Sequence, residues 1–343
     1  MNRVPDRLFA PPAAPEADTL RDLHGRHFAY LRLSLTDICN FRCSYCLPDG
    51  YRKPAVPKRF MSADEIERAV RSFARLGVWK IRLTGGEPTI RPDFLDIAAR
   101  VAATEGVRTV ALTTNGYRLP ERAQSYFDAG IRAINISIDS LGREGFAAIT
   151  GHDRLGEVMA GIAAARAAGF ETIKINTVLL KGLNDDELDD FLAFVRDQSL
   201  SLRFIELMRT NDNVEYFNRH HIPGDAIIER LGELGWDERA RAPGAGPARI
   251  FGHAGSSGTI GVIAPYAEDF CATCNRLRLS ATGKLHLCLF GEAGYDLRPL
   301  LRHDDQHDAL AARISGSLRF KQAGHFLHDG DSGATPHFAS IGG

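Results

Sequence analysis

The sequence predicts an α/β protein, built as a partial (β/α)6 barrel of the TIM type with a C-terminal extension. Between about residues 27 and 208, a strand-like run recurs roughly every 20 to 35 residues, and a helix-like run separates each pair. This alternation is typical of parallel strands joined by right-handed crossovers. The strands are polar on one face almost every time, which indicates that they surround a ligand-binding interior. A flatter, doubly wound sheet is the alternative architecture.

Six strands and the clearest helix can be placed in order. The strands are expected at AYLRLSL, VWKIRLT, TVALTTN, AINISID, TIKINTV and LRFIELM. The helix is SADEIERAVRSFARLG, where Ser62 and Glu65 form a capping box and Gly77 occupies the C-cap position. Three apolar residues share the helix face that should meet the sheet: Ile66, Val70 and Phe73.

Four of these strands carry charged, amide or hydroxyl side chains on their polar face. They are Arg32 and Ser34, then Lys80, Arg82 and Thr84, then Asn135, Ser137 and Asp139, and finally Lys174 and Asn176. Leucine or isoleucine alternates with them, and this apolar face must pack against the helices. Because buried charges need partners, the pattern favours a lumen with cationic walls that holds an anionic ligand. A sheet with one face in water is the simpler alternative.

We divide the chain into a flexible leader (1–19), a barrel core (20–222) and a C-terminal region (223–343). A helix is expected around 223–235, followed by the connector ARAPGAGPARIFGHAGSSG, which is rich in Gly, Ala, Pro and Ser. A last helical stretch is expected at about 305–321, and the chain ends in Gly-Gly.

Composition indicates a cytoplasmic protein that binds neither membranes nor nucleic acid. The formal net charge is −1, so no global basic field favours nucleic acid. No apolar run approaches the roughly 20 residues of a membrane-spanning helix, and the N-terminus lacks the apolar segment of a signal peptide. In a reducing cytoplasm, the six cysteines are better explained as metal ligands than as disulfides.

Cys39, Cys43 and Cys46 lie together in TDICNFRCSYC, directly after the first strand. Barrels of this kind carry their active sites at the C-terminal ends of the strands. Three thiolates on a 4Fe-4S cluster leave one iron open to an exchangeable molecule, just as a catalytic zinc keeps an open position. A zinc loop completed by a distant His or Cys is the alternative.

The C-x3-C-x2-C spacing, with Tyr45 before the last cysteine, resembles the radical S-adenosylmethionine superfamily, and LTGGEP after the second strand strengthens the resemblance. Gly85 and Gly86 allow backbone groups to approach a ligand closely. The resemblance implies that the open iron chelates the amino and carboxylate groups of S-adenosylmethionine. A transferred electron then cleaves S-adenosylmethionine to methionine and a 5′-deoxyadenosyl radical.

The segment FCATCNRLRLSATGKLHLCLF holds a second group of three cysteines: Cys271, Cys274 and Cys288. Arg276 and Arg278 are expected in the same loop, alternating on one face, and guanidinium groups suit phosphate. A second cluster with an open iron beside two arginines predicts a site for an anionic substrate. On spacing alone, a Cys3His zinc knuckle that includes His286 is an open alternative.

The C-x2-C-N-R-x-R-L…C arrangement closely resembles the molybdenum-cofactor biosynthesis protein A family, the GTP 3′,8-cyclases. From about Leu20 onward the resemblance includes TDICNFRCSYC, KIRLTGGEPTIR, LTTNG, ISIDSL, KINTVLLKGLNDDE and FIELM. It implies a partial barrel whose C-terminal extension carries the second 4Fe-4S cluster. It also implies that the adenosyl radical takes the hydrogen from C3′ of GTP and that the ribose radical attacks C8 of guanine. The cyclised dihydro-GTP would then pass to a downstream cyclic pyranopterin monophosphate synthase.

The resemblance also assigns residues by their positions. The residues expected to contact S-adenosylmethionine are Tyr45, Gly86, Ser137 and Met208. Those expected to hold GTP are Arg32, Lys80, Arg82, Thr113, Lys174, Arg276 and Arg278. The last two are also the expected catalytic residues, and the open iron of the second cluster would take the guanine edge.

The tail, the assembly and two other functions stay open at this point. The terminal Gly-Gly is expected to reach the active site, although TPHFASIGG lacks the Arg and Met that the family would place there. A flexible end without a role is the alternative. The family suggests a homodimer, and nothing in the sequence identifies the electron donor. The other functions are a radical enzyme that modifies a peptide and carries an auxiliary cluster, and a non-enzymatic zinc-binding interaction module.

Overall fold

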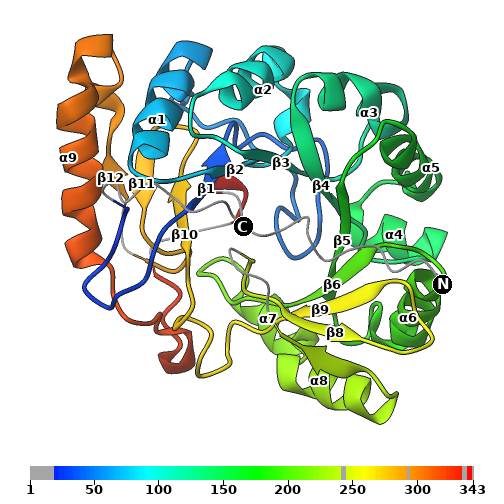
Figure 1. Ribbon diagram of the computed structural model, residues 1–343. Coiled ribbons are helices and arrows are strands. Elements are labelled where there is room, and N and C mark those ends of the chain that lie inside the picture. The colour runs from blue at the N-terminus through cyan, green and yellow to red at the C-terminus, as the bar shows by residue number, and fades with distance from the viewer. Residues whose placement is uncertain (1–18, 241–244, 292–293, 334–337, 342–343) are drawn as a thin grey trace.

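The computed structural model describes residues 19–240, 245–291, 294–333 and 338–341. Six parallel strands follow one another in the sheet in the order of the sequence. They are β1 (Tyr30–Ser34), β2 (Lys80–Thr84), β3 (Thr109–Thr114), β4 (Ile131–Ser137), β5 (Thr172–Leu179) and β6 (Ser201–Glu206). A doubly wound sheet reverses its strand order near the middle, whereas this order runs straight from β1 to β6, as in a barrel (Figure 1). The predicted partial (β/α)6 barrel is confirmed.

Helices connect these strands and cover the outer side of the curved sheet (Figure 1). They are α1 (Ala63–Arg75), α2 (Phe94–Ala103), α3 (Leu119–Asp128), α4 (Arg143–Thr150), α5 (Leu155–Ala167) and α6 (Leu188–Arg196). The capping box predicted for α1 is present, because Ser62 Oγ accepts from the Glu65 N–H at 3.2 Å and Glu65 Oε2 accepts from the Ser62 N–H at 2.8 Å.

The C-terminal region adds strands to both edges of this sheet. Three strands lie outward from β6: β9 (Thr259–Ile263), β8 (Arg249–Gly252) and β7 (Asp237–Arg239). Three more lie outward from β1: β10 (Arg276–Leu279), β11 (Lys284–His286) and β12 (Tyr295–Asp296). The alternation in the sequence predicts none of these six strands. One 12-stranded sheet therefore crosses the predicted domain boundary after residue 222, and that boundary stays a prediction.

Arg276 and Arg278 lie on strand β10, so their expected placement in a loop is wrong. The segment becomes a strand because it pairs in parallel with β1, with Arg276 opposite Tyr30 and Arg278 opposite Arg32. Residues two apart on a strand point to the same face, so the expected alternation holds. Both guanidinium groups therefore lie on a rigid strand beside Arg32.

Three further helices belong to the second half of the chain. They are α7 (Val214–His220), α8 (Gly224–Glu233) and α9 (His307–Ser317). α8 agrees with the helix predicted around 223–235. α9, together with the 3-10 turns that precede and follow it, agrees with the helical stretch predicted at about 305–321. Within the described residues, no helix is both long and apolar enough to cross a membrane.

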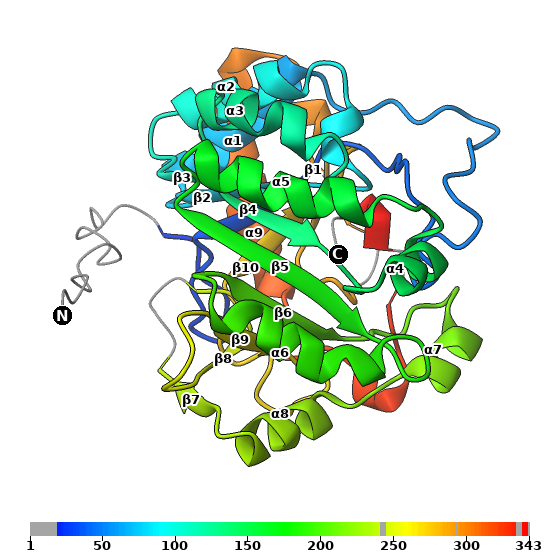
Figure 2. The same ribbon diagram turned by 90° about the vertical axis from the view of Figure 1, so that its right-hand side faces the viewer.

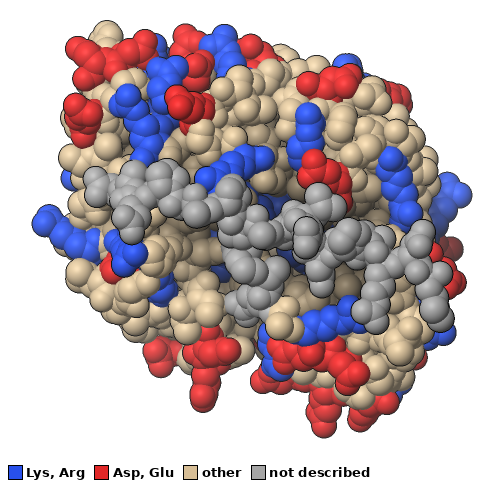
Figure 3. All heavy atoms as spheres, in the orientation of Figure 1, with Lys and Arg blue, Asp and Glu red and all other residues tan. Residues whose placement is uncertain are grey.

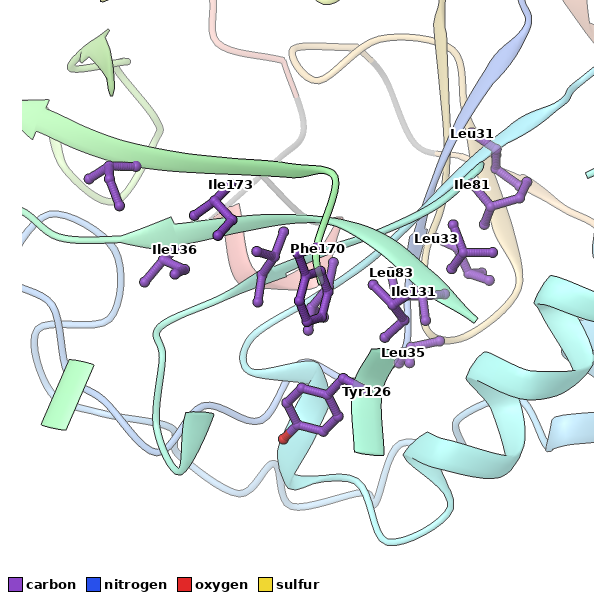
Figure 4. Packing of buried hydrophobic residues seen from close by; sticks show 14 of the residues in the cluster. Leu31, Leu33, Leu35, Ile81, Leu83, Tyr126, Ile131, Ile136, Phe170 and Ile173 are labelled. Carbon is purple, nitrogen blue, oxygen red and sulfur yellow. The ribbon is translucent and has the colours of Figure 1, made fainter. Parts of the chain in front are cut away.

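The apolar faces of the strands form the core between the sheet and its helices. Figure 4 shows Leu31, Leu33, Ile81 and Leu83 from neighbouring strands packed side by side, and all four are fully buried. Since successive side chains of a strand alternate between its faces, the polar residues point to the inner side. Figure 2 shows that β4 and β5 end on the side of the molecule where α4 and α7 lie. The connections at these strand ends form the first part of the site.

Candidate active site

A cavity of about 190 Å³ lies at the C-terminal ends of the barrel strands, and all three cysteines of the first group line it. Its wall also contains the four residues predicted to bind S-adenosylmethionine: Tyr45, Gly86, Ser137 and Met208. None of the six cysteines is in a disulfide. The structure therefore brings the first predicted cluster and the predicted cofactor residues to one place.

The loop that carries these cysteines is fastened on several sides. The backbone N–H groups of Arg42 and Ser44 donate to carbonyls at the end of α4, and the hydroxyls of Ser44 and Tyr216 are 2.7 Å apart. Phe41 is buried and stacks on the ring of His152 at a centroid distance of 4.9 Å. These contacts hold the thiols around the cavity without using the thiols themselves.

The thiols of this group become thiolates at neutral pH only if a metal binds them. Burial raises the pKa of Cys39 to about 12 and that of Cys46 to about 11, and it raises the pKa of Cys43 as well. Such thiols stay protonated at neutral pH unless a metal stabilises the thiolate. Within the described residues, no three His, Cys, Asp or Glu side chains are close enough to hold a single metal ion. Soft donors spread around a cavity fit the iron atoms of a 4Fe-4S cluster.

The two glycines of LTGGEP bring the loop after β2 against the cysteine loop. A Cβ at Gly85, whose φ is 137°, would lie 2.3 Å from the carbonyl oxygen of Thr36, and one at Gly86 would lie 2.3 Å from that of Ile38. The space therefore requires glycine at both positions. The N–H groups of Gly86 and Glu87 donate to the same two carbonyls, at 2.8 and 2.9 Å.

Asp139 is a buried carboxylate of this cavity, and its place in the polar alternation at the end of β4 did not predict a specific role for it. It accepts from Tyr45 Oη at 2.9 Å and from the Val178 N–H at 2.9 Å. Burial raises its pKa to about 6. The hydrogen bond fixes the ring of Tyr45 beside the thiols.

A second cavity, of about 130 Å³, lies deeper in the barrel, and the three cysteines of the second group line it. Four of the cations predicted to bind GTP share its wall: Arg32, Arg82, Arg276 and Arg278. The other three predicted residues lie close by or outside it. Thr113 lines the first cavity and its Oγ1 accepts from Arg82 at 3.2 Å, whereas Lys80 and Lys174 line neither cavity. Lys80 Nζ lies 5.2 Å from the ring centre of Tyr30.

Four further polar residues line the second cavity: Tyr30, Asn135, Asn176 and Arg203. Asn135 and Asn176 were predicted on the polar inner face without a specific ligand, whereas Tyr30 and Arg203 were not predicted there. A signal for Arg203 was present, because it alternates with Leu202 and Phe204 as Arg32 does with its leucines.

The crowding of cations makes this cavity strongly electropositive. Burial, together with Arg203, Arg82 and Lys80, lowers the pKa of Lys174 to about 6. Burial would raise the pKa of Tyr30, but the positive charges of Arg82, Arg32 and Lys80 outweigh it and lower that pKa to about 7. A polyanion would relieve this repulsion. On the face of the molecule shown in Figure 3, acidic and basic side chains are mixed around the outer edge. Lys and Arg atoms are visible in the hollow near the centre of this face.

The second cysteine group lies among cations too. Burial raises the pKa of Cys271, whereas for Cys274 the charges of Lys321, Arg276 and Arg26 outweigh burial and lower the pKa. His286, the fourth ligand in the zinc alternative, has a pKa lowered to about 4 by burial and by Arg278 and Lys284.

The two cavities adjoin, because Asn176, Ile205 and Met208 line both of them. The described part of the C-terminal tail reaches them as well. Phe338 and Ala339 line the first cavity, and the carbonyl oxygen of Ile341 accepts from Arg278 Nη1 at 3.3 Å. The terminal Gly-Gly (342–343), which is predicted to reach the active site, and residues 1–18 of the predicted leader lie outside the described residues.

Two family models match adjoining parts of the chain. The Radical SAM superfamily matches residues 33–195, and Molybdenum Cofactor Synthesis C matches residues 200–327. The first match contains the first cysteine group, and the second contains the other cysteine group with Arg276 and Arg278.

Curated relatives match nearly the full length of the chain. A protein from Stenotrophomonas maltophilia (strain R551-3) named GTP 3′,8-cyclase is 60% identical over 324 residues, which cover 94% of this chain and 99% of the relative. A protein of the same name from Aeromonas hydrophila is 56% identical over 328 residues, covering 94% and 96%.

Solved structures share the fold at low sequence identity. Streptococcus suis SuiB matches with a TM-score of 0.56 and 13% identity, covering 85% of this chain and 69% of SuiB. The structure of SuiB bound to S-adenosylmethionine matches with a TM-score of 0.55 and 12% identity, covering 78% and 62%. At this identity the likeness supports the radical S-adenosylmethionine fold alone.

Proposed function

Because the chain belongs to the GTP 3′,8-cyclase family of the radical S-adenosylmethionine superfamily, we propose that it converts GTP to (8S)-3′,8-cyclo-7,8-dihydroguanosine 5′-triphosphate. This is an early step of molybdenum-cofactor biosynthesis, as the match to Molybdenum Cofactor Synthesis C supports. The cofactors are two 4Fe-4S clusters and S-adenosylmethionine.

One observation carries the proposal: the two cysteine groups open into adjoining cavities, and only the deeper one has a wall of arginines. When bound, the first cluster and S-adenosylmethionine supply a 5′-deoxyadenosyl radical, using one electron from an external donor. A substrate in the deeper cavity then lies next to the site where that radical forms. Such placement of two reactants accounts for much of an enzyme's rate.

The residues divide between the two ligands. Cys39, Cys43 and Cys46 would hold the first cluster, with Tyr45, Gly86, Ser137 and Met208 around S-adenosylmethionine. The GTP set is Arg32, Lys80, Arg82, Thr113, Lys174, Arg276 and Arg278, to which the geometry adds Arg203. Cys271, Cys274 and Cys288 would hold the second cluster, whose open iron would take the guanine edge.

Arg276 and Arg278 join the substrate to the second cluster. They line the deeper cavity together with all three cysteines of that group, and Arg278 also contacts the tail. Bidentate guanidinium groups on a strand fix phosphate in both position and orientation.

We also propose a fate for the product, a cellular compartment and an oligomeric state. The product would pass to cyclic pyranopterin monophosphate synthase, and the enzyme would work in the cytoplasm, where thiols stay reduced. We also propose that it assembles as a homodimer, as the family resemblance suggests.

The reaction is tested anaerobically with iron–sulfur-reconstituted protein, reductant, S-adenosylmethionine and GTP, followed by mass spectrometry. We expect 5′-deoxyadenosine together with a cyclised product of the mass of GTP. If 5′-deoxyadenosine forms without that product, the substrate is wrong. If none forms from protein that retains its iron, the radical chemistry is wrong.

Arg276→Ala should separate GTP binding from S-adenosylmethionine cleavage. The variant should bind GTP more weakly, with a binding free energy reduced by about 1.5–3 kcal/mol for the loss of a hydrogen bond to a charged group, and keep most of its S-adenosylmethionine cleavage. Isothermal titration with GTP measures the first effect and the yield of 5′-deoxyadenosine the second. Equal loss of both would contradict the division of residues given above.

A further inference from the structure

Asn135 presents a buried acceptor atom that no described residue satisfies. The residue is 4% exposed on β4, and its Oδ1 has no hydrogen-bond partner within the described structure. Its Nδ2 donates to Oδ1 of Asn176 on the neighbouring strand β5, at 3.4 Å. Because buried polar atoms in native proteins are nearly always paired, this oxygen marks a position where a ligand can donate a hydrogen bond.

The two amides lie where the cavities meet. Asn135 lines the deeper cavity, and Asn176 lines both cavities. The arginines of β1, β2 and β10 are on one side of this junction, and the residues around S-adenosylmethionine are on the other. A nucleotide with its triphosphate on the arginines must bring its ribose to the junction for the adenosyl radical to reach C3′.

The chemistry of an amide pair fits the two hydroxyl groups of a ribose. Asn135 offers an acceptor and Asn176 an amide donor, and each ribose hydroxyl can donate and accept. A carboxylate at either position would lie next to cations, because Lys174 is opposite Asn135 and Arg203 is opposite Asn176 in the sheet. It would neutralise charge that the triphosphate needs, whereas a neutral amide leaves that charge available.

We propose that Asn135 and Asn176 bind the ribose hydroxyls of GTP and so direct C3′–H toward the radical. The proposal rests on the proposed function and adds a role for two residues. The pair also sets the sugar specificity, because a site built to bond a hydroxyl group rejects analogues that lack it.

The test uses reconstituted full-length Asn135→Ala and Asn176→Ala variants, with exposed Asn218→Ala of α7 as the matched control. For the first two, we expect the yield of cyclised product per 5′-deoxyadenosine to fall by about 100-fold, as for a misplaced reacting group. With GTP deuterated at C3′, the share of 5′-deoxyadenosine that carries deuterium should fall in parallel. Asn218→Ala should match the unaltered protein in both ratios.

A second readout is competition between GTP and 2′-deoxy-GTP. The unaltered protein should prefer GTP by about 10⁴-fold in kcat/KM, and at least one of the two variants should lose most of that preference. Iron content and S-adenosylmethionine cleavage confirm that each variant is folded, and Asn135→Ser provides a smaller change if Asn135→Ala does not fold.

Unchanged coupling, deuterium transfer and sugar preference in both variants would overturn the proposal, as would equal loss of S-adenosylmethionine cleavage and cyclisation. Failure of the proposed function gives a different result, because the unaltered protein would then form no cyclised product at all.

Discussion

Tyr30 places a phenol among the cations of the deeper cavity. Because this phenol can lose its proton near neutral pH, the charge of the cavity depends on pH. Arg82 donates from Nε to its hydroxyl, Lys80 lies over its ring, and Arg276 is its partner on β10. Arg32 and Arg203 also face it. With a pKa of about 7 the phenol is partly ionised at neutral pH, and it then serves as a counter-ion to this set.

GTP binding should therefore take up protons. A triphosphate favours neutral Tyr30 and charged Lys174, so binding raises both pKa values above the free values of about 7 and about 6. The sign follows from linkage: groups that gain protons on binding make affinity highest at low pH, and affinity falls as pH rises through the free-state values.

We expect the affinity for GTP to fall by roughly tenfold or more between pH 6.5 and 8.5, from a shift of about one pKa unit per group. Titration calorimetry in buffers of different ionisation heat would count the protons. Tyr30→Phe keeps the ring below Lys80 but should reduce both the proton count and the pH dependence. Tyr51→Phe, which lines neither cavity, is the control, and identical profiles for both variants would refute the role of Tyr30.

The segment before β1 holds the loop of the second cysteine group. Arg26 donates to the carbonyls of Cys271 at 3.0 Å, Ala323 at 2.7 Å and Gln322 at 2.5 Å. Its Nε pairs with buried Asp22 at 2.6 Å. Hydrogen bonds from Arg26 and His24 outweigh burial and lower the pKa of Asp22, so the pair is ionic at neutral pH.

Arg26→Ala should destabilise the protein by about 3–5 kcal/mol, because it leaves Asp22 buried without its partner. The second cluster should bind less firmly, so iron per chain should fall from about eight toward about four, while S-adenosylmethionine cleavage continues. Iron analysis and chemical denaturation measure these effects. Arg143→Ala removes an exposed ion pair instead and should leave stability and iron content nearly unchanged, because exposed ion pairs contribute little. A full iron content in Arg26→Ala would exclude this anchoring role.

Gly85 and Gly86, which follow β2, provide a second test of how the elements hold the site. In Gly86→Ala the new methyl group would meet the Ile38 carbonyl at 2.3 Å and displace the loop that carries Cys39. We expect loss of S-adenosylmethionine cleavage by about 100-fold or more, as for a misplaced reacting group. Gly156→Ala on α5 meets no atom within 4 Å and should stabilise the helix by up to about 1 kcal/mol. Equal activity of the two variants would show that the close approach is unimportant.

The elements also show what a sequence can predict. The strands β1 to β6 were predictable because each alternates apolar and polar residues over several positions. The C-terminal strands are only two to five residues long, so local patterns carry little signal. They form by pairing outward from β1 and β6, where β10 and β9 pair directly and the other four strands follow. The role of Arg26 could not be identified, because the carbonyls to which it donates lie 245 to 297 residues away in the sequence. The polar face indicated Asn135 and Asn176, but only their position at the junction suggests a ligand.

The C-terminal region covers both edge strands of the six-stranded barrel sheet, β1 and β6. β10 covers the free edge of β1 and β9 covers that of β6, each by parallel pairing. Exposed edges with unpaired N–H and C=O groups promote association between chains. The region that supplies the second cysteine group is therefore also part of the scaffold of the first.

A chain of residues 1–222, the predicted leader and core, should consequently fail to form a stable monomeric barrel. It would expose both edges and lose the apolar contacts that β9 and β10 make through Ile260, Val262 and Leu277. At about 1.5–3 kcal/mol for each fully buried aliphatic side chain, losing these three contacts would cost about 4.5–9 kcal/mol, which is comparable to the typical stability of a whole domain, about 5–15 kcal/mol. We expect aggregation or a non-cooperative unfolding curve, measured by size-exclusion chromatography and circular dichroism.

A chain of residues 19–343, which lacks only the first 18 residues, is the control and should fold cooperatively. A monomeric 1–222 chain with cooperative unfolding would instead establish residue 222 as a true domain boundary.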